Sequence, residues 1–236
     1  MLTILSKPLR SPELLILEFI AKFGVVAKSH LSSLFQLNSL EIIQINTLVR
    51  SLVRRKLIIQ HQILLEGDIY LTLASAGAQL FNQKSIDKLS LLKLNHDMLL
   101  IEIYFIYRQQ YTDTEIITEY ELKRINGIKV GEKKKVPDLL INDLIAIELE
   151  LTEKSHARLV EIINYYILDT SLKQVIYYVK SKSLAKKILN LSGSHPKLKV
   201  FMIDSDTTKF SVSPYLLNVT ADSYIQDFDI NEYLTS

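Results

Sequence analysis

Two carboxylates on one face of an apolar strand constrain this chain more than any other feature. Between residues 145 and 152 apolar residues alternate strictly with the others, which predicts a β-strand. Glu148 and Glu150 then lie on the same face. Like charges this close repel each other and raise each other's pKa unless a cation lies between them. Two interpretations remain open: a divalent metal ion bound by carboxylate oxygens, or an exposed strand face that is acidic.

A third carboxylate, Asp138, precedes this strand in a run predicted to form the other half of a hairpin, residues 136–141. If residues 142–143 formed a two-residue turn, Asp138 would point away from Glu148, because directly paired residues share a face. A shared metal ion therefore requires a bulge or a loop of odd length. A three-residue loop, 142–144, with a residue in the left-handed region would meet this requirement.

Composition indicates a folded globular protein. The chain has 236 residues, of which 48% are hydrophobic and 23% charged. No apolar stretch approaches the roughly 20 residues that span a bilayer, so we expect no membrane insertion. The first residues lack the layout of a signal peptide, and we expect a cytoplasmic location. The absence of cysteine excludes disulfides and cysteine-type zinc sites. The net charge of +2 does not indicate nucleic acid by itself.

Residues 1–82 are predicted to form a winged-helix DNA-binding domain. Pro12 and Gly24 begin and end the first helix. The remaining elements are a short helix at 30–35, a third helix from Ser39, and two strands at 57–64 and 69–73. Three helices followed by a hairpin are the order of a winged helix-turn-helix, in which the third helix enters the major groove.

The third predicted helix has an apolar side and a polar side. The apolar stripe contains Ile42, Ile45, Leu48, Val49 and Leu52. We expect base contacts from Gln44, Asn46 and Arg50, and phosphate contacts from Arg54, Arg55 and Lys56. Two alternatives stay open, because cations are favoured at any helix C-terminus and winged helices also bind proteins.

Residues 87–220 are predicted to form a second domain, an α/β fold with a mixed central sheet, and residues 221–236 a C-terminal tail. A long helix at 89–108 opens the domain, and His96 lies on its apolar stripe, where a histidine is most often a core residue. The other expected elements are a strand at 115–122, the carboxylate hairpin, a helix at 154–169, a strand at 174–179, a helix at 183–191 and a strand at 198–203.

Pro137-Asp138, followed by Glu148-Leu149-Glu150 on the next strand, resembles the signature of PD-(D/E)XK nucleases. Further matching residues are Tyr70-Leu71-Thr72, Gly77, Asn95-His96-Asp97, the run from Thr152 to Ser155, Arg158 and Asn164-Tyr165-Tyr166. With these the chain resembles the MobC-type (class C) conjugative plasmid relaxases and the related replication-relaxation proteins. Those families join an N-terminal winged helix to a PD-(D/E)XK restriction-endonuclease-like domain.

The resemblance implies a set of site residues. Asp138, Glu148 and Glu150 would bind Mg²⁺ or Mn²⁺. His96 or Asp97 would be contributed by the long helix, and Lys154, Arg158 and Tyr165 would flank the site. Glu150 stands where the usual nuclease lysine would be, so hydrolysis would depend on Lys154 reaching back.

The function implied is a metal-dependent, site-specific single-strand nick at an origin of transfer, with water as nucleophile or, alternatively, Tyr165. The partners would be double-stranded and nicked plasmid DNA, together with relaxosome accessory or coupling proteins. A second hypothesis is a non-cleaving, sequence-specific DNA-binding accessory or regulatory protein with a nuclease-like fold. A protein-docking adaptor is a third.

Overall fold

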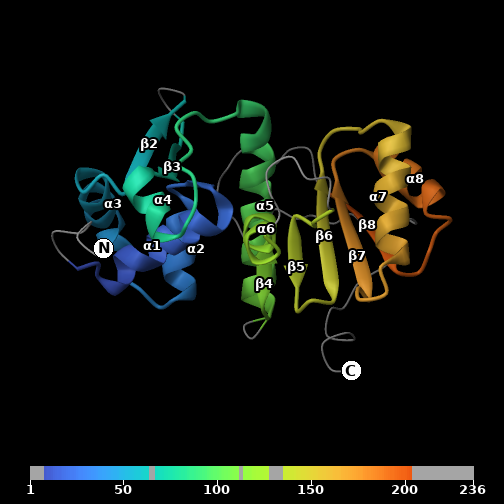
Figure 1. The fold of residues 1–236 in the computed structure, drawn as a ribbon, viewed down its shortest axis with the longest axis horizontal. Helices are drawn as coiled ribbons and strands as arrows, with labels where there is room; N and C mark the ends of the chain where they lie inside the picture. The colour runs from blue at the N-terminus through green and yellow to red at the C-terminus, as the bar shows by residue number, and fades with distance from the viewer. Residues whose placement is uncertain (1–7, 64–66, 112–113, 128–134, 204–236) are drawn as a thin grey trace. The chain divides into compact units, whose positions relative to one another are not determined.

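The computed structural model describes residues 8–63, 67–111, 114–127 and 135–203 (Figure 1). The chain divides into two compact units, Met1–Tyr111 and Thr112–Ser236. Both combine helices with a sheet, and the sheet of the second unit is mixed, so the predicted α/β class is confirmed. Within the described ranges, no helix is both long enough and apolar enough to cross a membrane. The predicted tail, 221–236, lies outside the described residues.

The first unit contains helices that cover a small antiparallel sheet with the strand order β1-β3-β2. Its elements are α1 (Ser11–Phe23), β1 (Val25–Ala27), α2 (His30–Leu37), the 3₁₀ helix η1 (Ile42–Gln44), α3 (Ile45–Arg54), β2 (Ile58–Gln62), β3 (Ile69–Leu73), α4 (Ser75–Leu80) and α5 (Leu91–Gln110). The sequence did not predict β1, whose short run pairs with β3 through contacts such as Val26 with Leu71.

The first and third helices begin differently. Helix α1 has proline in its first turn and ends at Gly24, whose φ of 80° is readily adopted by glycine, as expected. Helix α3 begins later than predicted, after a 3₁₀ turn, and Ile42 is 42% exposed. The prediction that Ile42 belongs to the buried stripe is therefore wrong. The buried side of α3 consists of Ile45, Leu48, Val49 and Leu52.

Gly77 allows α4 to lie against the start of β2. A Cβ atom at this position would be 2.1 Å from the backbone oxygen of Leu57. That oxygen also accepts a hydrogen bond from the Ala74 N–H at 3.0 Å, which holds the start of α4 close to the backbone of Leu57. Any side chain at residue 77 would therefore have to move backbone atoms.

Helix α5 belongs to the first unit, whereas the predicted boundary at residues 82–87 assigned it to the second domain. Its aromatic side chains pack on α1: the ring centroids of Phe19 and Phe105 are 5.5 Å apart, and those of Phe23 and Tyr104 are 5.2 Å apart. These contacts join segments far apart in sequence. Helical periodicity alone could not show which core the helix completes.

The second unit is built on a five-stranded sheet with the order β4-β5-β6-β7-β8. Its elements are β4 (Ile116–Thr118), α6 (Glu119–Ile125), β5 (Leu139–Ile141), β6 (Ile145–Glu150), α7 (His156–Leu168), β7 (Gln174–Val179), α8 (Lys182–Leu191) and β8 (Leu198–Met202). Strands β4, β5 and β6 are antiparallel, and β6, β7 and β8 are parallel.

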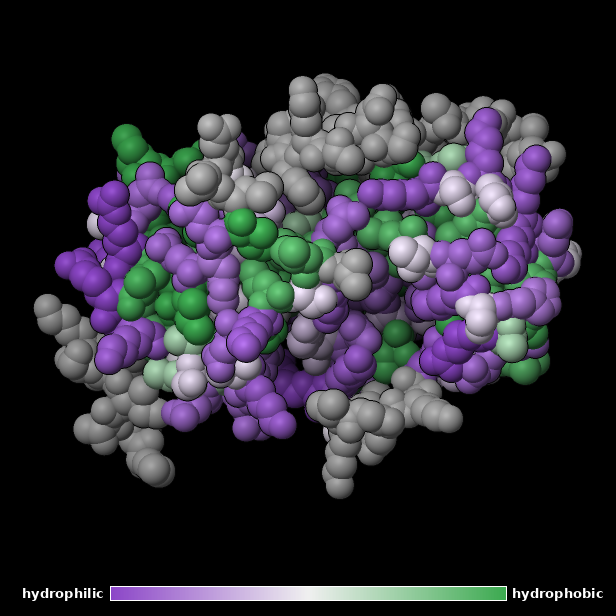
Figure 2. Space-filling view, turned by 90° about the horizontal axis from the view of Figure 1, so that it is seen from above, coloured by the Kyte–Doolittle hydropathy of each residue, from purple (hydrophilic) through white to green (hydrophobic). Residues whose placement is uncertain are grey.

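Helices α7 and α8 cover the same face of this sheet. Leu159 and Ile163 of α7 and Ile188 of α8 share one buried cluster with Ala146 and Val175 of the strands. Figure 2 shows hydrophilic side chains gathered over the right-hand end of the view, where Figure 1 places these helices. Both helices are thus amphipathic, with an apolar side toward the sheet.

The strand predicted at 115–122 ends early, because α6 begins at Glu119. The hydroxyl oxygen of Thr118 accepts a hydrogen bond from the Glu121 N–H at 3.4 Å. The Glu121 carboxylate in turn accepts one from the Thr118 N–H at 2.9 Å. This reciprocal pair is a capping box, which stabilises the first turn of a helix. The prediction of a continuous strand was therefore wrong after Thr118.

Candidate functional site

The loop between β5 and β6 has odd length. Ile141 pairs with Ile145, so residues 142–144 form a three-residue loop. Asn142 and Asp143 have φ values of 48° and 57°, in the left-handed region that Asn and Asp tolerate better than most residues. The prediction of a three-residue loop with left-handed backbone is confirmed.

This register places the predicted carboxylates on one face. Leu139 pairs with Ile147, so one step further along the hairpin Asp138 lies opposite Glu148. Glu150 follows two residues later, and side chains that far apart on a strand share a face. The three residues therefore lie on one face of the hairpin, which is the condition on strand register that the metal hypothesis sets.

The part of this face that β6 contributes is buried. Glu148 is 7% exposed and Glu150 is 4% exposed, and every residue of β6 is buried. The alternative of an exposed acidic strand face is therefore wrong. Helix α7 covers this side of the sheet, and the hydroxyl of Tyr166 donates a hydrogen bond to the Glu148 carboxylate.

Each carboxylate has a partner from within the chain. The Leu149 N–H donates to Asp138 Oδ2 at 2.8 Å, the Tyr166 hydroxyl donates to Glu148, and the Lys154 ammonium pairs with Glu150. Among the described residues, no three histidine, aspartate or glutamate side chains are arranged to hold a metal ion. Binding of an ion would therefore have to exchange some of these internal contacts for coordination.

Glu148 is the most perturbed group of the site. Burial raises the pKa of Glu148 to about 8, and the negative charge of Asp138 acts in the same direction. The hydrogen bond from Tyr166 and the positive charges of Lys154 and Lys135 lower this pKa, but less. Ionisation of Glu148 in the folded chain is therefore unfavourable, and an additional cation beside the carboxylates would make it more favourable.

Tyr177 is a second buried group that the sequence did not indicate as part of the site. It pairs with Glu148 across the parallel β6–β7 ladder and is completely buried. Its hydroxyl has no hydrogen-bond partner among the described residues. Burial raises the pKa of Tyr177, and the charges of Glu148, Glu150 and Asp138 raise it further, so the hydroxyl lies near all three carboxylates.

Two lysines lie near the carboxylates. Lys154 was predicted to lie in the following helix, but α7 begins at His156 with Ser155 as its N-cap. Lys154 therefore lies in the connection from β6, where it reaches Glu150. Lys135 was not predicted as a site residue. Burial lowers its pKa while the charge of Glu148 raises it, which places its ammonium group near Glu148.

Tyr165 and Arg158 lie on the outer side of α7. Tyr165 is 39% exposed, and its ring centroid is 5.4 Å from that of Tyr166. Burial raises the pKa of Tyr165, and the charge of Asp169 adds to the effect. Arg158 forms an ion pair with Glu161 at 2.6 Å in which both side chains are exposed.

His96 and Asp97 are part of α5 and therefore of the first unit, not of the unit that contains the carboxylates. The Nδ1 atom of His96 is 3.4 Å from Asp97 Oδ1, and Asp97 is buried. The compact second unit thus brings together Asp138, Glu148 and Glu150 without either residue.

The predicted DNA-binding residues on α3 and beside its two ends are mostly exposed. Gln44, Asn46, Arg50, Arg54 and Lys56 all lie at the surface. Gln44 donates a hydrogen bond to Glu41 at 3.0 Å. Arg50 and Arg54 have neither an ion pair nor a hydrogen bond from their side chains within the part of the chain that the structure describes.

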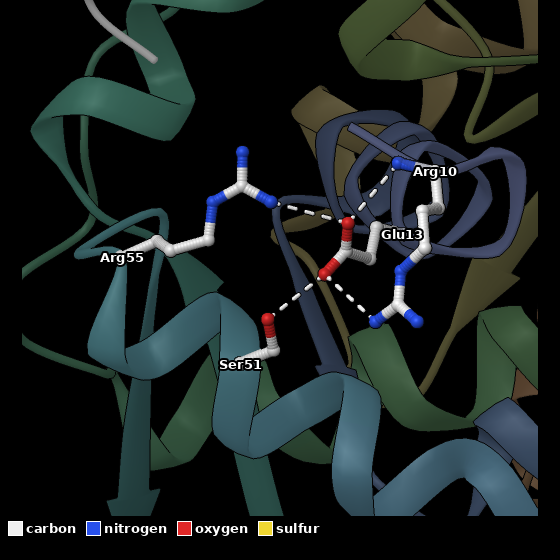
Figure 3. A network of polar contacts seen from close by, with 4 residues as sticks. All are labelled: Arg10, Glu13, Ser51 and Arg55. Carbon is white, nitrogen blue, oxygen red and sulfur yellow. Dashed lines mark hydrogen bonds and ion pairs between the residues drawn. The ribbon is translucent and has the colours of Figure 1, made fainter. Parts of the chain in front are cut away.

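Arg55 differs from its neighbours because it binds an internal carboxylate (Figure 3). Its Nη1 is 3.1 Å from Oε2 of Glu13, a residue that is only 1% exposed. Ser51 donates to the same carboxylate at 2.9 Å, and Arg10 donates from both its backbone and its side chain. Arg55 therefore connects α3 to α1, a role that the sequence did not reveal.

The pKa of Glu13 is lowered despite its burial. Burial alone would raise it, but the backbone N–H of Arg10, the hydroxyl of Ser51 and the guanidinium of Arg10 together outweigh that effect. The sequence contained a partial signal, since Glu13 occupies the third position of a helix where a capping interaction is expected.

Comparison of the chain with protein-family models, with curated proteins and with solved structures finds no match.

Proposed function

We propose that this chain is a metal-dependent DNA endonuclease of the relaxase kind, which nicks one strand of plasmid DNA at an origin of transfer. The first unit would bind the duplex and the second would cleave it. The observation that carries the proposal is the position of Asp138 opposite Glu148, with Glu150 on the same buried face. Carboxylate oxygens are the ligands that Mg²⁺ or Mn²⁺ prefers, and these three side chains would have to rearrange to share one ion.

The order of elements in the first unit supports a DNA-binding role. Helix, strand, helix, helix and two paired strands follow one another, and the first strand pairs with the last. This is the order of a winged helix-turn-helix, with α3 as the recognition helix and the β2–β3 hairpin as the wing. The exposed cations Arg50 and Arg54 on α3 would contact phosphates or bases.

The residues of the second unit fit a divalent cation in two further ways. Burial and the charge of Asp138 raise the pKa of Glu148 to about 8, and a cation bound beside the two carboxylates would lower it. The buried Tyr177 hydroxyl has no partner among the described residues and lies near the same carboxylates, where it would donate to a group bound there. A bound ion would polarise the scissile phosphate and lower the pKa of a water molecule.

The chain's own groups would prepare the site for that chemistry. Tyr166 holds the Glu148 carboxylate in place from α7. Lys154 and Lys135 supply positive charge beside the carboxylates, where negative charge develops on the phosphate during attack. Water is the nucleophile that we propose, because burial raises the pKa of Tyr165 and disfavours its phenolate.

A nicking assay tests this function. Supercoiled plasmid that carries origin DNA is incubated with the full chain and Mg²⁺ or Mn²⁺, and conversion to open circles is measured. Asp138→Asn and Glu148→Gln should each reduce the rate by about 100-fold or more. Glu161→Gln is a matched control, since that glutamate is exposed on α7. If the wild-type chain shifts the DNA in a gel but never nicks it, the nuclease proposal fails.

A second candidate function is a non-cleaving DNA-binding accessory or regulatory protein. The internal partners of the carboxylates favour it, since the Leu149 N–H, Tyr166 and Lys154 already satisfy them. The same assay separates the two functions: an accessory protein would bind a specific duplex equally well with Mg²⁺ or with a chelator and leave it intact.

A further inference from the structure

Ile43 is unusually exposed for a large apolar residue. Its exposed fraction of 87% is the highest among the exposed large apolar side chains that the structure describes. It lies in the 3₁₀ turn η1, immediately before α3. Single exposed apolar side chains are common on protein surfaces, so exposure alone carries no conclusion. Its neighbours on the helix surface are what make the position informative.

Ile43 begins a stripe of exposed side chains that runs along α3. It is followed at intervals of three, four and four residues by Asn46, Arg50 and Arg54, all exposed. This spacing keeps side chains on one side of a helix. The opposite side, which includes Leu48 and Leu52, is buried in the core of the unit. The stripe therefore points away from the fold.

The chemistry of the stripe matches the edges of base pairs in a major groove. The Arg50 and Arg54 side chains have no internal partner among the described residues, and their positive charge complements phosphates and guanine. Asn46 has the donor and acceptor that pair with adenine. Against this polar background Ile43 is apolar, and the apolar group that a base presents in the major groove is the 5-methyl group of thymine.

We infer that Ile43 contacts the 5-methyl group of a thymine in the DNA site, and so determines part of the sequence that the first unit recognises. The inference rests on the proposed DNA binding by that unit and names the base chemistry that it selects. The end of the recognition helix that reaches base edges in helix-turn-helix proteins is the N-terminal one, where Ile43 lies.

The test exchanges one methyl group on the DNA. A binding site is first selected from a pool of random duplexes with the full wild-type chain. Each thymine of the selected site is then replaced by deoxyuridine, which lacks only the 5-methyl group, and affinities are measured by fluorescence anisotropy. At one position the wild-type affinity should fall about fourfold, the effect of removing one buried methyl group.

The variant Ile43→Ala completes a double-mutant cycle. It should bind the thymine duplex less tightly than the wild-type chain does, and it should lose nothing further when deoxyuridine replaces the same thymine. Ile125→Ala is the matched control, because Ile125 is also exposed, at 65%, but belongs to α6 of the second unit. That variant should keep the wild-type response to the methyl group.

The outcomes separate the inference from the function on which it rests. If the wild-type chain enriches a site but no deoxyuridine replacement weakens binding, the inference is overturned while DNA binding stands. An equal response of Ile43→Ala and the wild-type chain to the loss of the methyl group overturns the inference too, because Ile43 would then not be the side chain that contacts it. If no duplex is enriched at all, the proposed DNA binding fails together with the inference.

Discussion

Glu13 of the first unit and Glu148 of the second are both buried glutamates, and their carboxylates are held in opposite ways. Glu13 is 1% exposed and Glu148 is 7% exposed. The pKa of Glu13 is lowered, because donors from Arg10 and Ser51 outweigh the effect of burial. The pKa of Glu148 is raised to about 8 by burial and by the charge of Asp138. Two carboxylates with little exposed surface therefore have opposite pKa shifts, because Glu148 lies deeper in its unit and faces a second carboxylate, whereas Glu13 accepts hydrogen bonds from several donors.

This difference separates a glutamate that stabilises the fold from one that we assign to the proposed site. Glu13 is satisfied by cations and donors within its own unit, as structural ion pairs usually are. Glu148 faces a second carboxylate and a tyrosine hydroxyl that lacks a partner within the described part of the chain. Strongly perturbed groups of this kind concentrate at functional sites.

The largest predicted effect is a pH dependence of stability that originates at Glu148. Because its pKa in the folded chain is raised from 4.5 to about 8, its contribution is fully present below pH 4.5 and is lost as the pH rises through 8. With a chelator present, the wild-type chain should lose on the order of 4 kcal/mol between pH 4.5 and pH 9 from this group. Urea denaturation followed by circular dichroism measures the loss.

Glu148→Gln should remove most of that pH dependence, since the amide stays neutral throughout. Glu161→Gln, an exposed substitution on the neighbouring helix, should leave it unchanged. An equal loss of stability in Glu148→Gln and the wild-type chain would show that Glu148 ionises normally and would remove the contrast with Glu13.

The next effect concerns Glu13 and has the opposite sign. Its lowered pKa means that its contribution is present above pH 4.5 and is lost as the pH falls. At pH 7, Glu13→Gln should reduce the free energy of unfolding by about 3 kcal/mol, because Arg55 and Arg10 lose their charged partner. Thermal unfolding at pH 7 measures this, with Glu18→Gln on the outer side of α1 as control. A change no larger than in the control would mean that Glu13 is not a structural ion pair.

A smaller effect on stability is expected when Arg50 of α3 is compared with Arg55, which caps the C-terminal end of that helix. Arg55→Ala should cost about 2 kcal/mol of stability, because it leaves the buried Glu13 short of a partner. Arg50→Ala should change stability by less than about 0.5 kcal/mol. On the proposed function, Arg50→Ala should also weaken binding of the selected DNA site by about 1 to 3 kcal/mol, the effect of one lost contact to a base. Equal stability losses in both variants would contradict the assignment of Arg55 to the fold.

The smallest effect distinguishes the two buried tyrosines next to Glu148. Tyr166→Phe removes the donor to Glu148 and should cost about 1 kcal/mol at pH 9, where Glu148 is charged. Tyr177→Phe removes a hydroxyl without a partner in the described residues and should be neutral or stabilising by up to about 1 kcal/mol in chelator. A clear loss of stability in Tyr177→Phe would reveal a hidden partner for its hydroxyl.

Local signals in the sequence predicted much of the fold. The run from Ser11 to Gly24 has a helix start and a glycine end, and α1 follows both. Strand β7 has the predicted bounds, 174–179, because its apolar residues are flanked by turn signals. The three-residue loop at 142–144 was predicted from a geometric demand, the need to place Asp138 and Glu148 on one face.

Contacts between distant segments were not predictable in the same way. Glu13 and Arg55 are 42 residues apart in the chain, and nothing local links them. Tyr177 enters the site only because β7 pairs in parallel with β6, and a single sequence does not give strand order. Helix α5 belongs to the first unit because its aromatic rings pack on those of Phe19 and Phe23 in α1, a contact between distant parts of the sequence.

The short loop at 142–144 has an evolutionary consequence. A strand with one solvent-exposed face resists a shift in its pairing register, because a shift by one residue would turn its apolar side chains toward solvent. Strand β6 is buried on both faces and lacks that safeguard. The odd number of residues in the loop is then what keeps Asp138 opposite Glu148. Asn142 helps to hold the loop, because its backbone and its side chain both form hydrogen bonds with the backbone of Glu115. Relatives should therefore vary the residues of this loop more freely than their number, and a change of one residue in length should mark lineages that have lost the site.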